Sequence, residues 1–108
     1  MAVNYEAVYR AVESYVADVK ATIPIDKVYL FGSYAKGTAN EYSDVDICFF
    51  SKNFEDTENE AIFLKLHDFT LKYAREAVYI EPHTFATYHL YNDNPFVKEV
   101  LRTGREIL

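Results

Sequence analysis

The stretch Gly32-Ser-Tyr-Ala-Lys-Gly-Thr-Ala-Asn-Glu-Tyr-Ser-Asp-Val-Asp46 joins two short apolar runs, residues 27–32 and 44–51. Both runs are rich in β-branched and aromatic residues and are too short for typical helices, so we predict a β-strand from each. Residues 33–43 are predicted to form a loop with one helical turn, which Gly37 ends. The chain therefore places a polar loop between two buried strands.

The glycine-serine end of this stretch has the features of an anion-binding turn. Ser33 can cap a short helical turn whose unpaired backbone N–H groups attract an anion. Gly32 lets the backbone approach a phosphate closely, because it has no Cβ. Lys36 can add a positive charge to the same site. Gly-Ser is a common turn, so this loop does not define a function by itself.

The carboxylate end of the stretch is more informative. Asp44 and Asp46 lie two residues apart in a predicted strand, so both side chains are expected on one face. Adjacent carboxylates repel each other unless a cation lies between them, and a hard ion such as Mg²⁺ is the simplest reason for an acid pair in a buried strand. A third carboxylate is expected on a neighbouring strand, and Glu81, at the end of the run 77–81, is the best candidate.

Helical spacing of apolar residues marks the rest of the chain. We predict a first helix from Asn4, its cap, to about Ala21. A capping box formed by Thr57 and Glu60 should begin a second helix.

The remaining boundaries are marked by prolines and a glycine. The third strand is expected over residues 77–81 and is interrupted by Pro82. A further helix is expected to begin at Asn94, with proline at its first position, and to end at Gly104. Residues 106–108 are a candidate final strand. The order predicts an α+β fold, a small mixed sheet covered by helices.

Composition limits the function. The chain has 108 residues and a net charge of −6, which argues against a protein that coats nucleic acid. Half of the residues are hydrophobic, which excludes a disordered chain. The sequence has neither a signal peptide nor an apolar run of the ~20 residues that span a bilayer. We therefore expect one domain, residues 1–108, in the cytoplasm and without membrane contact.

A few other side chains have both a structural and a functional interpretation. His83 shares a strand face with Glu81 and is a candidate neighbour of the acids. Cys48 is interpreted as a small buried hydrophobe. The aromatic residues Tyr88, Tyr91 and Phe96 lie around polar loops and could form an exposed adhesive patch.

The combined pattern resembles the minimal nucleotidyltransferases of the DNA polymerase β-like superfamily. The resemblance rests on Gly32-Ser33, ten intervening residues and Asp44-Val-Asp46, and extends to the last helix, Asn94 to Gly104. It implies the polymerase β-like nucleotidyltransferase fold for the whole chain.

The resemblance also implies roles for the loop residues. Gly32 and Ser33 would hold the β- and γ-phosphates of a nucleoside triphosphate such as ATP. Lys36 falls where the family has Arg or Lys, and Ser43 belongs to the same nucleotide-binding set.

The acids would hold two Mg²⁺ ions. Asp44 and Asp46 would be the principal metal ligands and catalytic acids, with Glu81 as the third acid, where many relatives have Asp. The reaction implied is in-line attack of an acceptor hydroxyl on the α-phosphate, with release of pyrophosphate.

The acceptor is suggested by family relationships alone. Members of this family often pair with a helical protein of the HEPN type and act as antitoxins, attaching AMP to a tyrosine of that toxin. Two alternatives remain open: a catalytically silent module that neutralises a partner by contact or forms a homo-oligomer, and a transferase to a small molecule such as an aminoglycoside.

Overall fold

The structure is a computed structural model that describes residues 3–54 and 60–107. Its elements in chain order are α1 (Tyr5–Thr22), β1 (Lys27–Phe31), α2 (Ser33–Lys36), β2 (Val45–Phe50), the 3₁₀ turn η1 (Lys52–Phe54), α3 (Glu60–Ala74), β3 (Ile80–Phe85), the 3₁₀ turn η2 (Thr87–Leu90), α4 (Pro95–Thr103) and β4 (Arg105–Glu106).

The strands form one mixed sheet in the order β3-β2-β1-β4. β1 runs antiparallel to both β2 and β4, whereas β2 and β3 are parallel. The predicted α+β class, a small mixed sheet covered by helices, is thereby confirmed.

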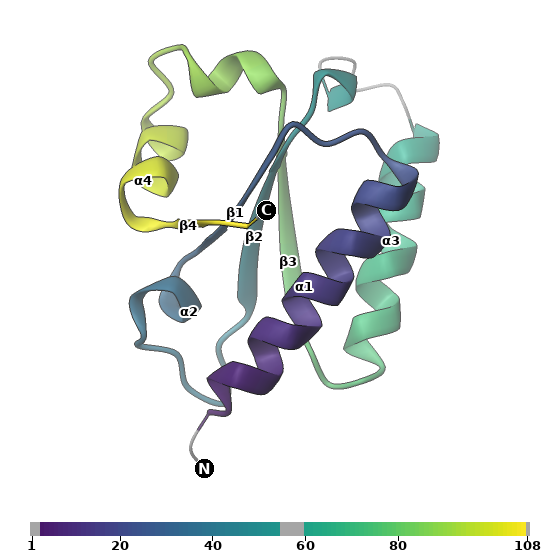
Figure 1. Ribbon diagram of the computed structural model, residues 1–108, viewed down its shortest axis with the longest axis vertical. Coiled ribbons are helices and arrows are strands. Elements are labelled where there is room, and N and C mark those ends of the chain that lie inside the picture. Colours follow the sequence, from purple (N-terminus) through teal and green to yellow (C-terminus); the bar gives the residue numbers. More distant parts are fainter. Residues whose placement is uncertain (1–2, 55–59, 108) are drawn as a thin grey trace.

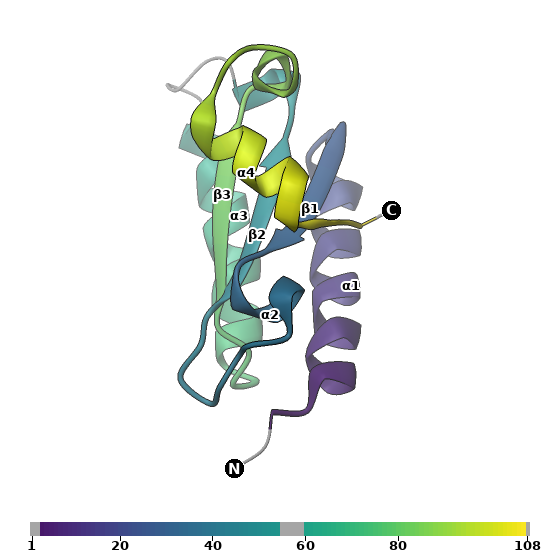
Figure 2. The same cartoon turned by 90° about the vertical axis from the view of Figure 1, so that its left-hand side faces the viewer.

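Helices cover both faces of the sheet. α1 and α3 lie side by side on one face, and α4 lies on the other, as the two views show (Figure 1, Figure 2). Because side chains alternate along a strand, a strand covered on both faces contributes to two cores, as β2 does. Val45, Ile47 and Phe49 of β2 belong to the larger core beneath α1 and α3. Cys48 and Phe50 belong to the smaller core beneath α4.

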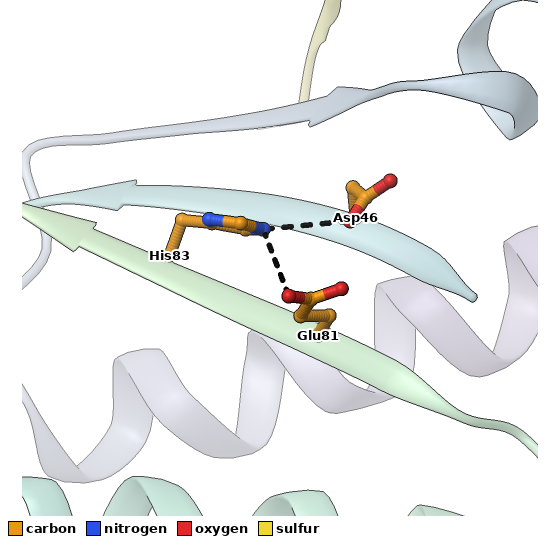
Figure 3. Close-up of side chains that lie close together, drawn as sticks. All are labelled: Asp46, Glu81 and His83. Atoms are coloured by element: carbon orange, nitrogen blue, oxygen red, sulfur yellow. Dashed lines mark hydrogen bonds and ion pairs between the residues drawn. The ribbon is translucent and has the colours of Figure 1, made fainter. Parts of the chain in front are cut away.

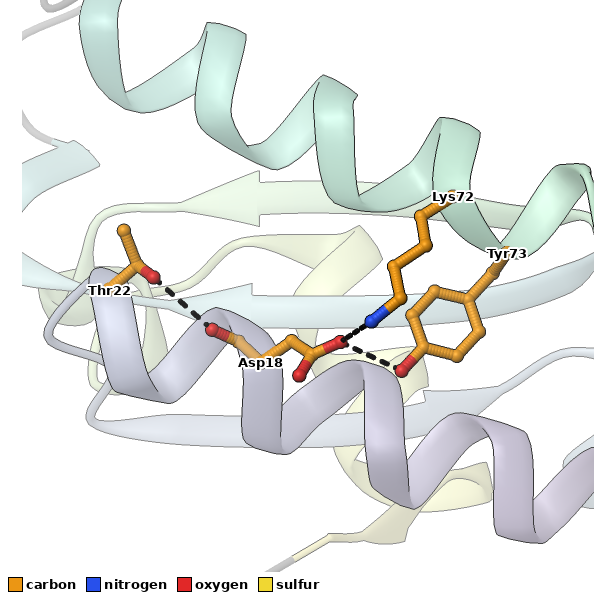
Figure 4. A network of polar contacts seen from close by, with 4 residues as sticks. All are labelled: Asp18, Thr22, Lys72 and Tyr73. Carbon is orange, nitrogen blue, oxygen red and sulfur yellow. Dashed lines mark hydrogen bonds and ion pairs between the residues drawn. The ribbon is translucent and has the colours of Figure 1, made fainter.

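A polar network ties α1 to α3 (Figure 4). The Asp18 carboxylate on α1 accepts hydrogen bonds from the Tyr73 hydroxyl at 2.8 Å and from Nζ of Lys72 at 3.1 Å, both on α3. Thr22 donates its hydroxyl to the backbone carbonyl of Asp18 at 3.4 Å. The network fixes how the two helices lie against each other.

Most local predictions are confirmed. The side chain of Asn4 accepts a hydrogen bond from the Ala7 amide, and that of Asn94 accepts one from the Val97 amide, so both are N-caps. The single helical turn after Gly32 is α2, and it ends at Gly37 in the left-handed conformation. The predicted cap Thr57 lies outside the described residues, and α3 is described from Glu60.

The third strand is a correction. We expected residues 77–81 with Pro82 as an interruption, but β3 runs from Ile80 to Phe85 and includes Pro82, which pairs with Ile47. β3 is an edge strand, where a residue without an N–H group is tolerated. The final strand is β4, residues 105–106, one residue earlier than its predicted start.

Within the described residues, no helix is both long and apolar enough to cross a membrane.

Candidate active site

Strand register brings two of the predicted acids together. Asp46 of β2 lies directly opposite Glu81 of the parallel strand β3. Asp46 shares a sheet face with Cys48, and Glu81 shares one with His83, because side chains two residues apart project the same way. Both acids therefore lie at one end of the face that α4 covers further along.

His83 joins these two acids (Figure 3). Its Nε2 atom lies 3.4 Å from Oδ1 of Asp46 and 3.9 Å from Oε1 of Glu81. Ligand atoms of the three residues all lie within 4.8 Å of one another. The side chains of Asp46 and His83 are about one-quarter exposed, whereas that of Glu81 is 58% exposed. The cluster therefore opens to solvent on the Glu81 side.

The environment of Asp46 disfavours its negative charge. Burial raises the pKa of its carboxyl group, and the charges of Glu81 and Asp44 raise it further, while the hydrogen bond with His83 opposes the shift. A buried acid surrounded by other acids is stabilised by a cation. A cation bound beside Asp46 would therefore favour its ionised form.

Gly32 lies against the Asp46 carboxylate. Its φ angle is +72°, and a Cβ added to it would overlap with Oδ2 of Asp46. A side chain at position 32 would therefore displace this carboxylate. The glycine lets the Asp46 carboxylate lie against the backbone at the junction of β1 and α2.

Two tyrosines of α1 hold the loop that follows Gly32. The Tyr9 hydroxyl donates to the carbonyl of Tyr34 at 2.8 Å, and the Tyr5 hydroxyl accepts from the amide of Ala39 at 3.0 Å. The loop is thus anchored to the helix on the far side of the sheet.

The remaining predicted loop residues lie around this turn. Ser33 is the first residue of α2, and Lys36 is its last and is exposed. The pKa of Glu99 on α4 is lowered mainly by a hydrogen bond from Arg102 and also by the charge of Lys36. The ammonium group of Lys36 is thus within electrostatic reach of α4.

Asp44 and Ser43 lie outside the cluster of ligand atoms. Asp44 is exposed and precedes β2, which begins at Val45. The alternation that we expected to place Asp44 and Asp46 on one strand face therefore does not include Asp44. Its charge nevertheless reaches Asp46. The Ser43 hydroxyl accepts a hydrogen bond from the amide of Asn40 at 2.9 Å, which closes the turn before β2.

Aromatic rings pack around His83. Phe31 packs edge-on against it with ring centroids 5.0 Å apart, and Phe96 lies 5.7 Å away. Phe31 is a residue of the site that the sequence pattern did not predict. The alternation of the first strand places Phe31 on one face, but only the pairing of Phe31 with Asp46 reveals which face that is.

The exposed aromatic patch is partly continuous with the site. Tyr88, Tyr91 and Phe96 are all exposed, as expected. Ring contacts run from Tyr88 through His89 and Phe85 to Phe96. The patch therefore begins beside His83 and extends across η2.

The donor set of the cluster fits a divalent cation. Two carboxylates and an imidazole are all metal ligands. Burial, and after it the charges of Glu81 and Asp44, raise the pKa of Asp46, and a bound cation would stabilise the ionised carboxylate against both effects. A cavity of about 460 Å³ lies elsewhere, beside α1 and β4, where Tyr9, Leu30 and Arg105 line it. We place the functional site at the cluster, because that is where ionisable groups converge.

The fold and the site define a small α+β domain with an acidic cluster beside a glycine turn. Residues 12–102 match the model of the nucleotidyltransferase domain, and the chain belongs to this family. Nucleotidyl transfer is therefore its general class of activity.

A solved structure shows the same fold. The crystal structure of a protein from Sulfolobus solfataricus, provisionally named a nucleotidyltransferase, has a TM-score of 0.54 and 20% sequence identity to this chain. The alignment covers 76% of this chain and 68% of the other. No curated protein sequence matches the chain significantly.

Proposed function

We propose that the protein is a Mg²⁺-dependent nucleotidyltransferase of the minimal type, which transfers AMP from ATP to a hydroxyl acceptor in the cytoplasm. The observation that carries the proposal is the pairing of Asp46 with Glu81 directly beside Gly32. A chain of the nucleotidyltransferase family thus has its acids on neighbouring strands, next to the turn that would receive the phosphates.

The acids are the proposed metal-binding and catalytic groups. Asp46 and Glu81 would hold Mg²⁺ from the two strands, and exposed Asp44 would complete the set from the loop. Bound Mg²⁺ would neutralise the triphosphate and lower the pKa of the acceptor hydroxyl. Glu81 would also help to accept the proton of an approaching hydroxyl, a role supported by its being the most exposed member of the cluster.

The turn after β1 is the proposed phosphate site. Ala35 and Lys36 both donate their amides to the carbonyl of Gly32 at 3.1 Å, so the amides of Ser33 and Tyr34 belong to the first turn of α2. Amides in this position are without partners inside their own helix and bind anions. Lys36 would add charge from outside the turn, and Ser43 would support the loop through its bond to Asn40.

The proposed acceptor is a tyrosine hydroxyl of a helical HEPN-type partner, with this protein acting as the antitoxin. Two features support a macromolecular acceptor: the Glu81 side of the cluster is open, and the exposed rings of Tyr88 and Phe96 extend from it. An exposed aromatic surface beside a catalytic site is suited to binding another protein.

The test is to incubate the protein with Mg²⁺ and ATP, with and without the product of the neighbouring gene, and to measure the masses of both proteins. We expect pyrophosphate release and a mass increase of one AMP unit on the partner. The Asp46→Asn variant should produce neither. An unchanged partner mass with the wild-type protein would count against this acceptor.

The same experiment separates the alternatives. A silent module would bind the partner without releasing pyrophosphate, whether or not Asp46 is replaced. A small-molecule transferase would release pyrophosphate with an aminoglycoside or another hydroxyl compound and leave the partner unmodified.

A further inference from the structure

The position of His83 suggests a specific property of the metal centre. Its Nε2 atom faces a carboxylate oxygen of Asp46 and one of Glu81, at 3.4 and 3.9 Å. We propose that His83 is a nitrogen ligand of the metal and that the site binds a divalent transition metal more tightly than Mg²⁺. This inference rests on the proposed metal centre and adds its ligand set and selectivity.

The hydrogen bond between His83 and Asp46 is long, and both nitrogen–oxygen distances are compatible with ligands that share an ion. A charge-assisted bond from an imidazole to a carboxylate normally brings the heavy atoms to about 2.7–2.9 Å. Here the nitrogen lies farther from both oxygens, although the side chains of Asp46 and His83 are about three-quarters buried and Phe31 packs against the ring. Space therefore remains among the three groups.

The spacing is close to that of ligands around one ion. Ligand atoms about 2.0–2.2 Å from a metal are at most about 4.4 Å apart. The atoms of Asp46, Glu81 and His83 already lie within 4.8 Å of one another. Small side-chain rotations, most easily of exposed Glu81, would bring all three into range.

The aromatic surroundings position the imidazole for this role. Phe31 contacts the ring edge-on at 5.0 Å, and Phe96 lies against it at 5.7 Å. β3 fixes the backbone of His83 opposite Cys48, two residues from the Asp46–Glu81 pair. The nitrogen is therefore directed at the acids by packing and by strand register.

The ligand types determine the expected selectivity. Mg²⁺ prefers oxygen ligands and strict octahedral geometry, whereas imidazole nitrogen favours transition metals. A centre with one nitrogen and two carboxylates should therefore prefer Co²⁺ or Mn²⁺ to Mg²⁺ at equal concentration. A centre built from carboxylates alone would have much less of this preference.

The direct test is pulsed electron paramagnetic resonance of the wild-type protein loaded with Mn²⁺ alone. We expect a hyperfine coupling from one ¹⁴N nucleus, which disappears in the His83→Ala variant. Calorimetry should show that this variant binds Co²⁺ at least about ten-fold more weakly, while its affinity for Mg²⁺ changes by less than about three-fold. His67→Ala, an exposed position on α3, is the matched control and should change neither.

Circular dichroism of each variant establishes that it is folded. A Mn²⁺-loaded wild-type protein without ¹⁴N coupling, or equal losses of Co²⁺ and Mg²⁺ affinity in His83→Ala, would overturn the inference. The proposed function is tested separately: ¹⁴N coupling without any nucleotidyl transfer would leave the metal ligand established and the transfer reaction refuted.

Discussion

A methyl group at position 32 would overlap with the Asp46 carboxylate, and the positive φ angle of Gly32 is one that other residues rarely adopt. Gly37 has a similar φ angle of +76°, but a Cβ added there would contact nothing within 4 Å. Both glycines therefore need a positive φ angle, but Gly37 is in the left-handed helical region, whereas Gly32, with a ψ angle of −154°, is in a region almost restricted to glycine. Only Gly32 also lies against the site.

This difference gives a prediction with its own control. Gly32→Ala and Gly37→Ala should each lower the free energy of unfolding by about 1 kcal/mol or more, because alanine is strained at positive φ. Only Gly32→Ala should also abolish metal binding, since its methyl group displaces the Asp46 carboxylate. Urea unfolding and Co²⁺ calorimetry measure the two effects. Equal metal affinity in the two variants would show that Gly32 does not shape the site.

Substitutions of Glu81 can separate the effect of side-chain length from the effect of charge. Glu81→Asp keeps the carboxylate and shortens it by one methylene, so we expect nucleotidyl transfer to fall by less than about ten-fold. Glu81→Gln removes the charge and should lower the rate about a hundred-fold or more. Pyrophosphate release measures both rates. If Glu81→Gln were as active as the wild type, the third acid would have to be sought elsewhere.

The sequence predicted the acids individually but not their arrangement. The alternation of a strand indicated a common face for Asp44 and Asp46, yet β2 begins at Val45, so Asp44 lies outside that regular geometry. The pairing of Asp46 with Glu81 depends on the register of two parallel strands that are far apart in the chain. No local pattern encodes such a register.

At the scale of elements, α1 and α3 are joined by the Asp18 network described above (Figure 4). Hydrogen bonds from Tyr73 and then Lys72 lower the pKa of Asp18 below its ordinary value of 3.8. Because the folded pKa is lower than the unfolded one, the ionised carboxylate stabilises the fold above about pH 4, and this contribution is lost as the pH falls through the folded pKa.

Asp18→Asn should therefore destabilise the protein in a pH-dependent way. We expect a loss of about 0.5–1 kcal/mol at pH 7, because the pair with Lys72 is partly exposed to solvent. The difference from the wild type should shrink towards zero below about pH 3. Urea titrations at several pH values measure this. A loss of equal size at pH 7 and pH 2.5 would mean that the carboxylate charge is not responsible.

Helix boundaries were predictable because their signals are local. Asn4, Asn94 and Gly104 act within a few residues of their position in the chain, and each lies at the helix end where the pattern placed it. The third strand was placed too early because Pro82 suggests an end to a strand. β3 tolerates Pro82 because it lies at the sheet edge, and its edge position is a property of the assembled sheet.

At the scale of the whole molecule, the sheet separates two cores, and Cys48 lies in the smaller one beneath α4. Its side chain is completely buried, and burial raises the pKa of the thiol to about 12. At neutral and mildly alkaline pH, Cys48 is therefore protonated. Because only the thiolate is nucleophilic, the buried side chain should react slowly.

Cys48 should therefore report on opening of the fold. A disulfide reagent at pH 8 should label the native protein only at the rate at which the sheet and α4 separate, and should label the urea-unfolded protein within the mixing time. Quantitative labelling of the native protein within seconds would contradict the burial of this core.

The central claim is that Asp46 and Glu81, together with the Gly32 turn, form a site for a metal ion and a nucleotide. Calorimetric titration with ATP in the presence of Mg²⁺ tests it most directly. The wild-type protein should give a saturable binding signal, and Asp46→Asn, which replaces the carboxylate with an amide of the same shape, should bind at least about ten-fold more weakly, a cost of about 1.4 kcal/mol. Equal affinities in the two proteins, or no binding by the wild type, would contradict the account.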